Sequence, residues 1–265
     1  MRAGSAASVQ RYFRPELDWL RFLAFSLVFA NHASFWGAEP FLDLGIPEQV
    51  VRNVVLPLAR AGAHGVDLFF VLSAFLITEL LLLERDRTGS VHVVSFYARR
   101  ILRIWPLYFV FLAIVFPLEY YANPQSLDYF LSFLVFMGNW HYVLWGGALI
   151  VSEPLWTVCV EEQFYLVWPI FLRNLQRRRL MIFLLIVFAF ANVYRATLIL
   201  GNWPDASPIL RNTFARMDCF AIGGILACVL HGRSIVLPRW LRAILAGSAF
   251  GLFWAVGHTP GLHDA

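Results

Sequence analysis

The sequence contains no lysine and little charge of either sign. Charged residues make up 14% of the 265 residues, against roughly 25% in an average soluble domain. Hydrophobic residues make up 60%, and the mean hydropathy is +0.65. These figures exclude a disordered chain and a coiled coil. The composition instead predicts an all-α protein, a polytopic transmembrane helical bundle that forms a single membrane-embedded domain over residues 1–265.

Cysteine is also scarce, with three residues that all fall inside apolar stretches. Neither a CxxC pair nor a His/Cys spacing typical of zinc ligands occurs, so no metal site is predicted. The pattern excludes a disulfide-stapled secreted domain. We expect Cys159, Cys219 and Cys228 to be buried free thiols.

Arginine supplies all of the basic side chains. The 21 arginines give the chain a net charge of +4 and a pI of about 9.2. They cluster between apolar runs rather than along one amphipathic face, which is the pattern of membrane topology and not of nucleic-acid binding. We therefore expect the lipid bilayer, and no nucleic acid, as a partner.

The apolar runs predict seven membrane spans, since a helix needs about 20 residues to cross the hydrocarbon core. The first run contains Arg21 and His32 and lacks a small-residue cleavage site, so we interpret it as a retained span and not as a signal peptide. A shorter apolar piece at 127–139 raises the count to eight only if it crosses. The seven runs lie at 17–36, 65–84, 104–120, 156–172, 180–200, 213–231 and 241–257.

The arginine clusters predict the orientation of these spans. Arginines lie before the first span, between the second and third, just after 156–172 and before the last. Placing all of them in the cytoplasm puts the N-terminus inside. This arrangement requires 119–155 to stay on the outer side, with 127–139 re-entrant or interfacial; if 127–139 crosses, the arginines at 173–179 lie outside. We favour the first arrangement, a multi-pass protein of the plasma (inner) membrane with a cytoplasmic N-terminus.

Two polar side chains interrupt the first span. Arg21 and His32 are eleven residues apart, which places them on one helix face about 16 Å apart along the axis. Histidine exchanges a proton near neutral pH, as a general base for a hydroxyl must. The spacing alone fits a purely structural role equally well. In that case Arg21 extends to the membrane surface and His32 forms a hydrogen bond with a backbone carbonyl.

A second pair lies at the cytoplasmic mouth of the third span. Arg100 and Arg103 are at positions i and i+3 and share a helix face. Two guanidinium forks there suit the phosphates of a ligand, which they bind bidentately. Without other information, a plain positive-inside anchor is the more common explanation.

Adjacent carboxylates, Glu161 and Glu162, lie near the start of the span 156–172. Carboxylates at such a position are costly unless they face a polar cavity or cations. Successive helical residues point about 100° apart, so we expect the two to face different partners. One of them is a candidate to orient His32 or an arginine.

Two further segments carry charges that we interpret as structural. In Arg216-Met217-Asp218 we expect an ion pair between the two charged residues. In the segment 65–78, Asp67 is expected to cap the helix, and the small pair Ser73-Ala74 is expected to allow close packing of helices.

Together these segments resemble the acyltransferase 3 family of integral membrane O-acyltransferases. Arg21 and His32 match its Arg/Lys-x10-His element, and Arg100 and Arg103 match its RxxR element. The elements occur in the family order and cover about residues 15–230. Three further segments are similar to family motifs, namely GVDLFFVLSAFLIT, LWTVCVEEQFYLVWP and FARMDCFAIGGILA.

The chain departs from the family pattern in three places. Ala74 stands where a glycine is usual, and Thr157 and Cys159 stand where serines are common. The chain also ends after seven or eight spans, whereas members of the family carry more. We therefore expect a protein shortened at its C-terminus.

The resemblance implies an enzyme that transfers an acyl group other than aminoacyl, most often acetyl. The donor would be acyl-CoA, by default acetyl-CoA, acting as a co-substrate with no bound cofactor. The acceptor would be a carbohydrate, commonly a cell-surface polysaccharide or its lipid-linked glycolipid precursor. Alternatives are O-acylation of a small secondary metabolite such as a macrolide sugar, or a transport or non-catalytic membrane protein.

The same resemblance implies a role for each candidate. His32 would be the catalytic base, Arg21 would line the donor passage, and Glu161 or Glu162 would orient the imidazole. The donor's phosphates would bind to Arg100 and Arg103. Because the sequence has no GxSxG motif, direct transfer and a transient acyl-enzyme both stay open.

Overall fold

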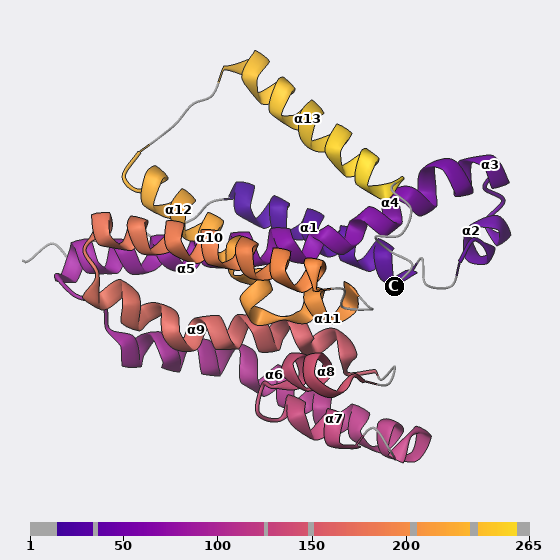
Figure 1. Cartoon of the computed structure of the whole chain (residues 1–265), viewed down its shortest axis with the longest axis horizontal. Helices are drawn as coiled ribbons and strands as arrows, with labels where there is room; N and C mark the ends of the chain where they lie inside the picture. The colour runs from indigo at the N-terminus through magenta and orange to yellow at the C-terminus, as the bar shows by residue number, and fades with distance from the viewer. Residues whose placement is uncertain are drawn as a thin grey trace, which may run out of the picture.

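The secondary structure is entirely helical in the described part of the chain. The computed structural model describes residues 15–33, 37–124, 127–147, 151–201, 206–233 and 238–258, and these ranges contain no strand. Figure 1 shows long helices side by side along the long axis of the molecule. The predicted all-α class is confirmed.

The predicted spans correspond to helices whose ends differ from the predicted ends by a few residues, apart from 104–120, where the helix starts earlier. Residues 34–36 of the first run lie outside the described residues. The long helices are α1 (Pro15–Ala33), α5 (Gly65–Thr88), α6 (Val93–Ala122), α9 (Trp156–Asn174), α10 (Arg177–Leu200), α12 (Thr213–Leu230) and α13 (Arg239–Gly257).

Fewer helices than the seven or eight predicted spans qualify as membrane-crossing when both their length and their composition are considered. Within the described residues, five helices are long and apolar enough to cross a membrane. Helices α1 and α9 have 19 residues each, but they carry the charged candidates Arg21, Glu161 and Glu162. The count of seven or eight is therefore not confirmed.

The segment before α5 is helical where the sequence analysis expected a connection. A short α2 (Glu39–Asp43) is followed by α3 (Glu48–Val50), the π-helical turn η2 (Val51–Val55), α4 (Leu56–Ala61) and the 3-10 turn η3 (Gly62–His64). The elements from α3 to α5 form one continuous helical stretch, Glu48–Thr88, of 41 residues. Pro57 lies inside this stretch, directly after the π-helical turn η2, where its missing N–H removes one hydrogen bond of the regular helical pattern.

The doubtful segment 127–139 forms no long helix. It divides between α7 (Leu127–Phe133) and α8 (Gly138–Trp145), of seven and eight residues. Phe136, in the turn between them, has a left-handed φ of 57°. Neither helix approaches the 20 or so residues that a membrane crossing requires. This outcome favours the arrangement in which 127–139 does not cross.

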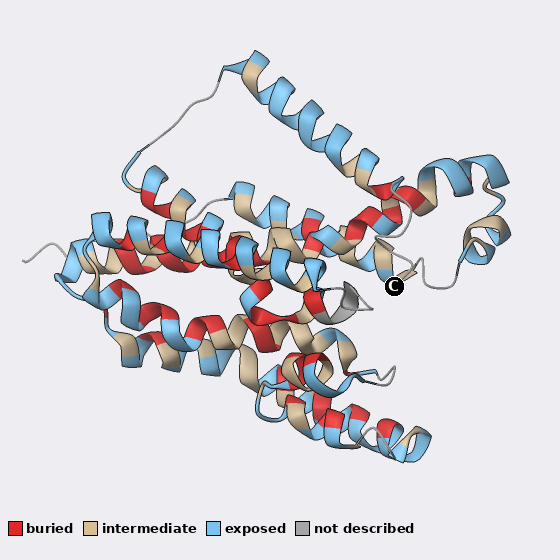
Figure 2. Ribbon diagram, viewed as in Figure 1, coloured by how far each residue is buried: buried red, intermediate tan, exposed pale blue. Residues whose placement is uncertain are grey.

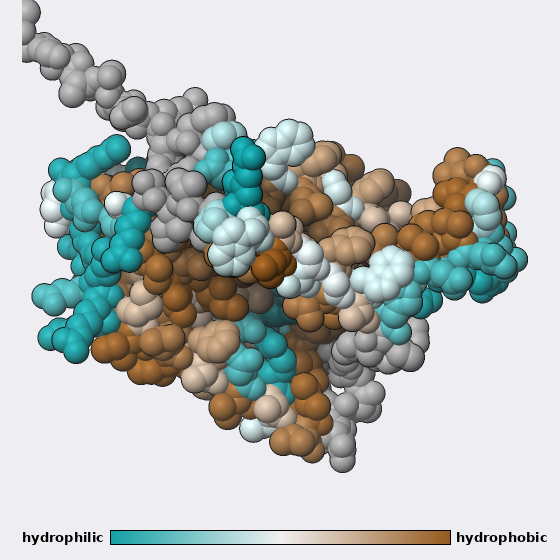
Figure 3. Space-filling model, turned by 90° about the horizontal axis from the view of Figure 1, so that it is seen from above, coloured by the Kyte–Doolittle hydropathy of each residue, from teal (hydrophilic) through white to brown (hydrophobic). Residues whose placement is uncertain are grey.

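One end of the bundle collects the arginines, and we call it the arginine end. Arg85 of α5 donates hydrogen bonds to the carbonyls of Leu172 and Leu175, 3.1 and 2.9 Å away, at the end of α9. Arg177 at the start of α10 donates to the Cys228 carbonyl near the end of α12. Hydrophilic side chains gather there in Figure 3, at the left of a largely hydrophobic middle.

The opposite end, which we call the loop end, is tied together by polar contacts between short segments. The 3-10 turn η5 (Glu153–Leu155) precedes α9, and α11 (Ala206–Arg211) precedes α12. Glu119 at the end of α6 accepts hydrogen bonds from the Ser152 amide and hydroxyl, at 2.6 and 3.0 Å. Arg211 forms an ion pair with Glu153. These contacts fix the segments that lead into α9 and α12.

The main core lies between α5, α9, α10 and α12. The Phe220 ring stacks on Phe70 and on Phe164, with centroids 4.9 and 4.4 Å apart. Gly223 places the backbone of α12 directly against the Val71 carbonyl of α5. The helix α13 lies apart from this core and is largely exposed along its length (Figure 2).

Candidate active site

Helix α1 carries both polar residues of the first span. Arg21 lies 3.7 Å from Asp18, one turn before it, and His32 is an exposed residue near the C-terminal end of the helix. Since α1 is continuous between them, the predicted separation of about 16 Å along one helix holds in the structure.

Two glycines set the register of α1 against the long helical stretch. Gly62 packs against the Leu27 carbonyl and Gly65 packs against the Ala24 carbonyl. The Asn31 side chain donates to the Arg60 carbonyl at 3.3 Å. The two segments are therefore antiparallel, and His32, the next residue after Asn31, lies at the level of Arg60 towards the loop end.

Glu161 lies at a different level. Its Oε1 atom accepts a hydrogen bond of 2.6 Å from the hydroxyl of Ser73 in α5. Thirteen residues of continuous helix separate Ser73 from Arg60, or about 20 Å along the axis. Of the two partners expected for one of the glutamates, His32 is therefore wrong, whereas the alternative, an arginine, agrees with the proximity of Arg100 to Glu161. The reason is that α9 starts, at Trp156, deeper in the bundle than the end of α1.

Glu162 faces α6 instead of α5. Its Oε2 atom accepts a hydrogen bond of 3.0 Å from the indole of Trp105. Its Oε1 atom is buried and has no hydrogen-bond partner among the described residues. The two glutamates thus point at different helices, as their spacing predicted, and Glu162 keeps an acceptor available inside the bundle.

Arg100 lies beside these carboxylates in the interior of the bundle. Its guanidinium is 5.6 Å from the Phe96 ring centroid and 5.4 Å from that of Tyr165. It interacts electrostatically with Arg103, Glu161 and Arg21. We call Arg21, Arg100, Arg103 and Glu161 the charged cluster.

The structure thus brings together five of the six candidates and separates the sixth. The charged cluster and Glu162 lie around α5, α6 and α9 at one depth, while His32 lies towards the loop end. Arg100 and Arg103 were expected at the cytoplasmic mouth of the span 104–120. Helix α6 begins earlier, at Val93, so both residues lie two to three turns inside the helix. Arg100 is half-buried and Arg103 is exposed.

Three partners of this site were missed by sequence reasoning. Ser73 was interpreted as a packing residue, and Trp105 and Tyr165 were given no role. A signal existed in the apolar surroundings of Glu161, since a carboxylate there requires donors nearby. The identity of these hydrogen-bond donors depended on how the helices pack, which the sequence did not show.

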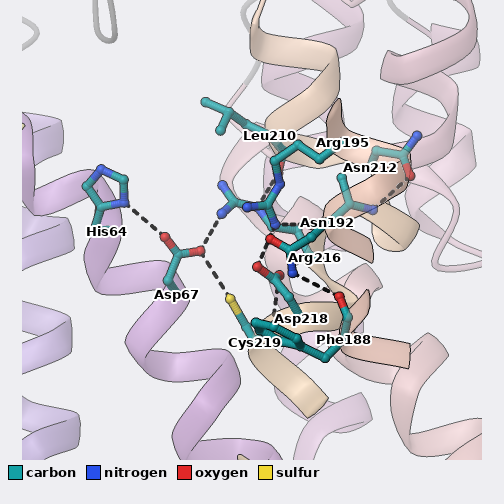
Figure 4. Close-up of polar contacts among 11 residues, drawn as sticks. His64, Asp67, Phe188, Asn192, Arg195, Leu210, Asn212, Arg216, Asp218 and Cys219 are labelled. Atoms are coloured by element: carbon teal, nitrogen blue, oxygen red, sulfur yellow. Dashed lines mark hydrogen bonds and ion pairs between the residues drawn. The ribbon is translucent and has the colours of Figure 1, made fainter. Parts of the chain in front are cut away.

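Two structural expectations are also wrong in detail. Asp67 lies in the first turn of α5, after the N-cap residue His64, and its side chain forms an ion pair with Arg216 of α12. Asp218 pairs with Arg195 of α10 at 2.7 Å and not with Arg216. Figure 4 shows both pairs side by side, joining three helices. The pairs form between helices because Arg216 and Asp218 point to different sides of α12.

The cysteines behave as expected. Cys159, Cys219 and Cys228 are free and buried. The Cys219 thiol lies 3.6 Å from Asp67 Oδ1, and that of Cys159 lies 3.8 Å from the Tyr108 hydroxyl.

Comparisons with known proteins agree with the motifs. Residues 14–263 match a family model described as an acyltransferase domain. The peptidoglycan O-acetyltransferase OatA of Listeria monocytogenes is 29% identical over 254 residues, covering 89% of this chain and 37% of that protein. The O-acetyltransferase OatA of Staphylococcus aureus is 26% identical over 206 residues, covering 73% and 34%. The chain thus spans about a third of the length of these relatives. No solved structure matches it significantly.

Proposed function

Because this chain belongs to the acyltransferase domain family, we propose that it is a membrane O-acetyltransferase whose donor is acetyl-CoA and whose acceptor is a hydroxyl of a cell-wall polysaccharide. The names of the two relatives support O-acetylation, and that of the Listeria protein supports peptidoglycan as the class of acceptor. The observation that carries the proposal is a cluster of three arginines within the helical bundle, with an exposed histidine about 16 Å further along α1.

The charged cluster is suited to the phosphates of the donor. It contains three guanidinium groups, and each presents a fork of N–H donors that can bind two oxygens of a phosphate. The Arg100 guanidinium lies 5.4 Å from the ring centroid of Tyr165, and Glu161 attracts it electrostatically.

The separation between the cluster and His32 fits a donor with a long arm. Arg21 and His32 are about 16 Å apart on one face of α1. The pantetheine arm of coenzyme A is long and flexible, so it can carry the thioester from phosphates at the cluster towards the loop end. His32 then takes the proton of the acceptor hydroxyl, whose oxygen attacks the thioester carbonyl. The C–O bond forms, the C–S bond breaks, and coenzyme A leaves.

This proposal implies that the arginine end faces the cytoplasm, where acyl-CoA occurs, and that the loop end faces the acceptor. Single cysteines at Asn123 and Gln176, in a background without the three native cysteines, test the orientation in intact cells. An impermeant maleimide added outside should label position 123 and not position 176. Labelling of position 176 alone would reverse the orientation and remove the proposed path of the donor.

The direct test of the function is transfer of a labelled acetyl group. The purified chain in detergent is incubated with labelled acetyl-CoA and a soluble peptidoglycan fragment, and the product is analysed by mass spectrometry. We expect an ester-linked acetyl group on the glycan. Release of acetate without glycan product, or no consumption of acetyl-CoA, would contradict the proposal.

Exchanging each arginine for lysine separates phosphate binding from a topological role. Arg100→Lys and Arg103→Lys keep the charge and lose the bidentate fork. We expect a higher KM for acetyl-CoA with kcat little changed. The larger effect should come from Arg100→Lys, which also loses the planar contact with Phe96 and Tyr165. An unchanged KM in both variants would mean that these residues serve only as positively charged membrane anchors. The matched control is Arg173→Lys at the arginine end.

A further inference from the structure

A second histidine lies at the loop end and has no part in the mechanism above. His64, in the turn η3, makes a contact of 3.0 Å between its Nδ1 atom and Asp67 Oδ2. We propose that His64 is a further catalytic residue, which protonates the sulfur of the departing coenzyme A, and that Asp67 is its positioning residue. This inference rests on the proposed function.

Asp67 is held firmly enough to orient an imidazole. Arg216 of α12 forms an ion pair with its Oδ1 atom, and the Cys219 thiol lies 3.6 Å from the same oxygen. Arg216 is itself fixed by a hydrogen bond of 2.6 Å from its Nε atom to the Leu210 carbonyl. The carboxylate therefore has one oxygen bound by α12 and the other directed at His64, as Figure 4 shows.

A fixed carboxylate determines which nitrogen of a histidine reacts. When Asp67 accepts the hydrogen of Nδ1, Nε2 becomes the nitrogen that exchanges a proton with a reacting group. In Figure 4 the far side of the His64 ring points away from Asp67 and Arg216. The His64 side chain is 48% exposed, so a substrate can reach this side of the ring.

The position of His64 matches the end of the bundle where the proposed reaction takes place. The Arg60 carbonyl accepts a hydrogen bond from Asn31, the residue next to His32. His64 follows Arg60 by four residues, or about 6 Å along the helix axis. The η3 turn itself packs against α1, since Gly62 contacts the Leu27 carbonyl. His64 thus lies about one helical turn deeper than the level of His32, between it and the charged cluster.

The reaction has a task for each histidine. The acceptor hydroxyl loses a proton, which His32 takes as the oxygen attacks the thioester carbonyl. When the C–S bond breaks, the sulfur carries the electron pair and needs a proton, which His64 supplies from Nε2. Transfer of a proton from His32 to His64 through solvent restores both residues, so atoms and charge balance over one turnover. Other charged groups near this site are Arg60, Arg216 and Asp218.

The experiment compares two donors whose leaving groups differ in their need for a proton. Acetyl-CoA releases an alkyl thiolate, whereas the acetyl thioester of 4-nitrothiophenol releases a stabilised thiolate that leaves without protonation. The variants are His64→Gln, which keeps an N–H for Asp67, and His32→Ala. His92→Gln at the arginine end is the matched control, since His92 is also exposed.

With acetyl-CoA, we expect His64→Gln to lower kcat by about 10²-fold, the lower end of the usual effect of a general acid. With the activated thioester, the same variant should match the wild type within a few-fold, while His32→Ala stays slow with both donors. An equal loss with both donors would make His64 a structural residue, and no loss with either would exclude a role. A wild type inactive with both donors would overturn the proposed function itself, and this inference with it.

Discussion

Replacing His32 by alanine should abolish acetyl transfer while the protein still folds and inserts into the membrane. The residue is exposed near the end of α1, where the substitution removes no core packing. If His32 is the general base, its loss should lower kcat by about 10² to 10⁴-fold. The measurement is the initial rate of acetyl transfer from acetyl-CoA to a soluble glycan.

The control for this experiment is His92→Ala, which removes an exposed histidine at the arginine end. Thermal unfolding in detergent should give the same midpoint for both variants and the wild type. If His32→Ala keeps activity within a few-fold of the wild type, the base must be another residue, and His64 would be the first alternative.

The second large effect is expected from Gly223→Val in α12. A Cβ atom at this position would overlap the Val71 carbonyl and press on Ala74 and the Phe75 amide of α5. Because the obstacle is backbone, the two helices must move apart, and overpacking of this kind costs about 1–3 kcal/mol or more. We expect a clearly lower unfolding midpoint and loss of transfer activity.

Gly251→Val provides a matched control for that substitution. Gly251 is also a glycine inside a long helix, α13, but a Cβ there meets no atom within 4 Å. Its replacement should leave the unfolding midpoint unchanged. Equal destabilisation by the two substitutions would mean that the effect comes from the helix backbone, and not from the contact between α5 and α12.

A displaced α12 would also disturb the polar contacts at the loop end. Arg216 reaches Asp67 only when α12 packs closely on α5. Without Arg216, the Asp67 carboxylate that contacts His64 loses its anchor on α12. Activity of Gly223→Val should therefore fall even in the fraction of protein that remains folded. A ratio of activity to folded protein equal to that of the wild type would contradict this coupling.

The amino-acid sequence by itself determined the class of protein, the approximate helix ends and the residues that share a helix face. Hydrophobic runs separated by arginines are sufficient for this, because length, period and charge are properties of one segment at a time. The placement of Arg21 and His32 on one helix, and the different directions of Glu161 and Glu162, follow from the helical period alone.

The tertiary structure alone decided which residues meet. Ser73 and Glu161 are 88 residues apart in the chain, and Asp67 and Arg216 are 149 apart. Their meeting depends on how far each helix is shifted along its neighbour, and close backbone contacts such as those of Gly62 with Leu27 and Gly223 with Val71 set that shift. The helical period contains no information on it. For this reason the sequence left both His32 and an arginine open as the partner of a glutamate. Packing places the glutamates with the arginines, about 20 Å from the level of His32.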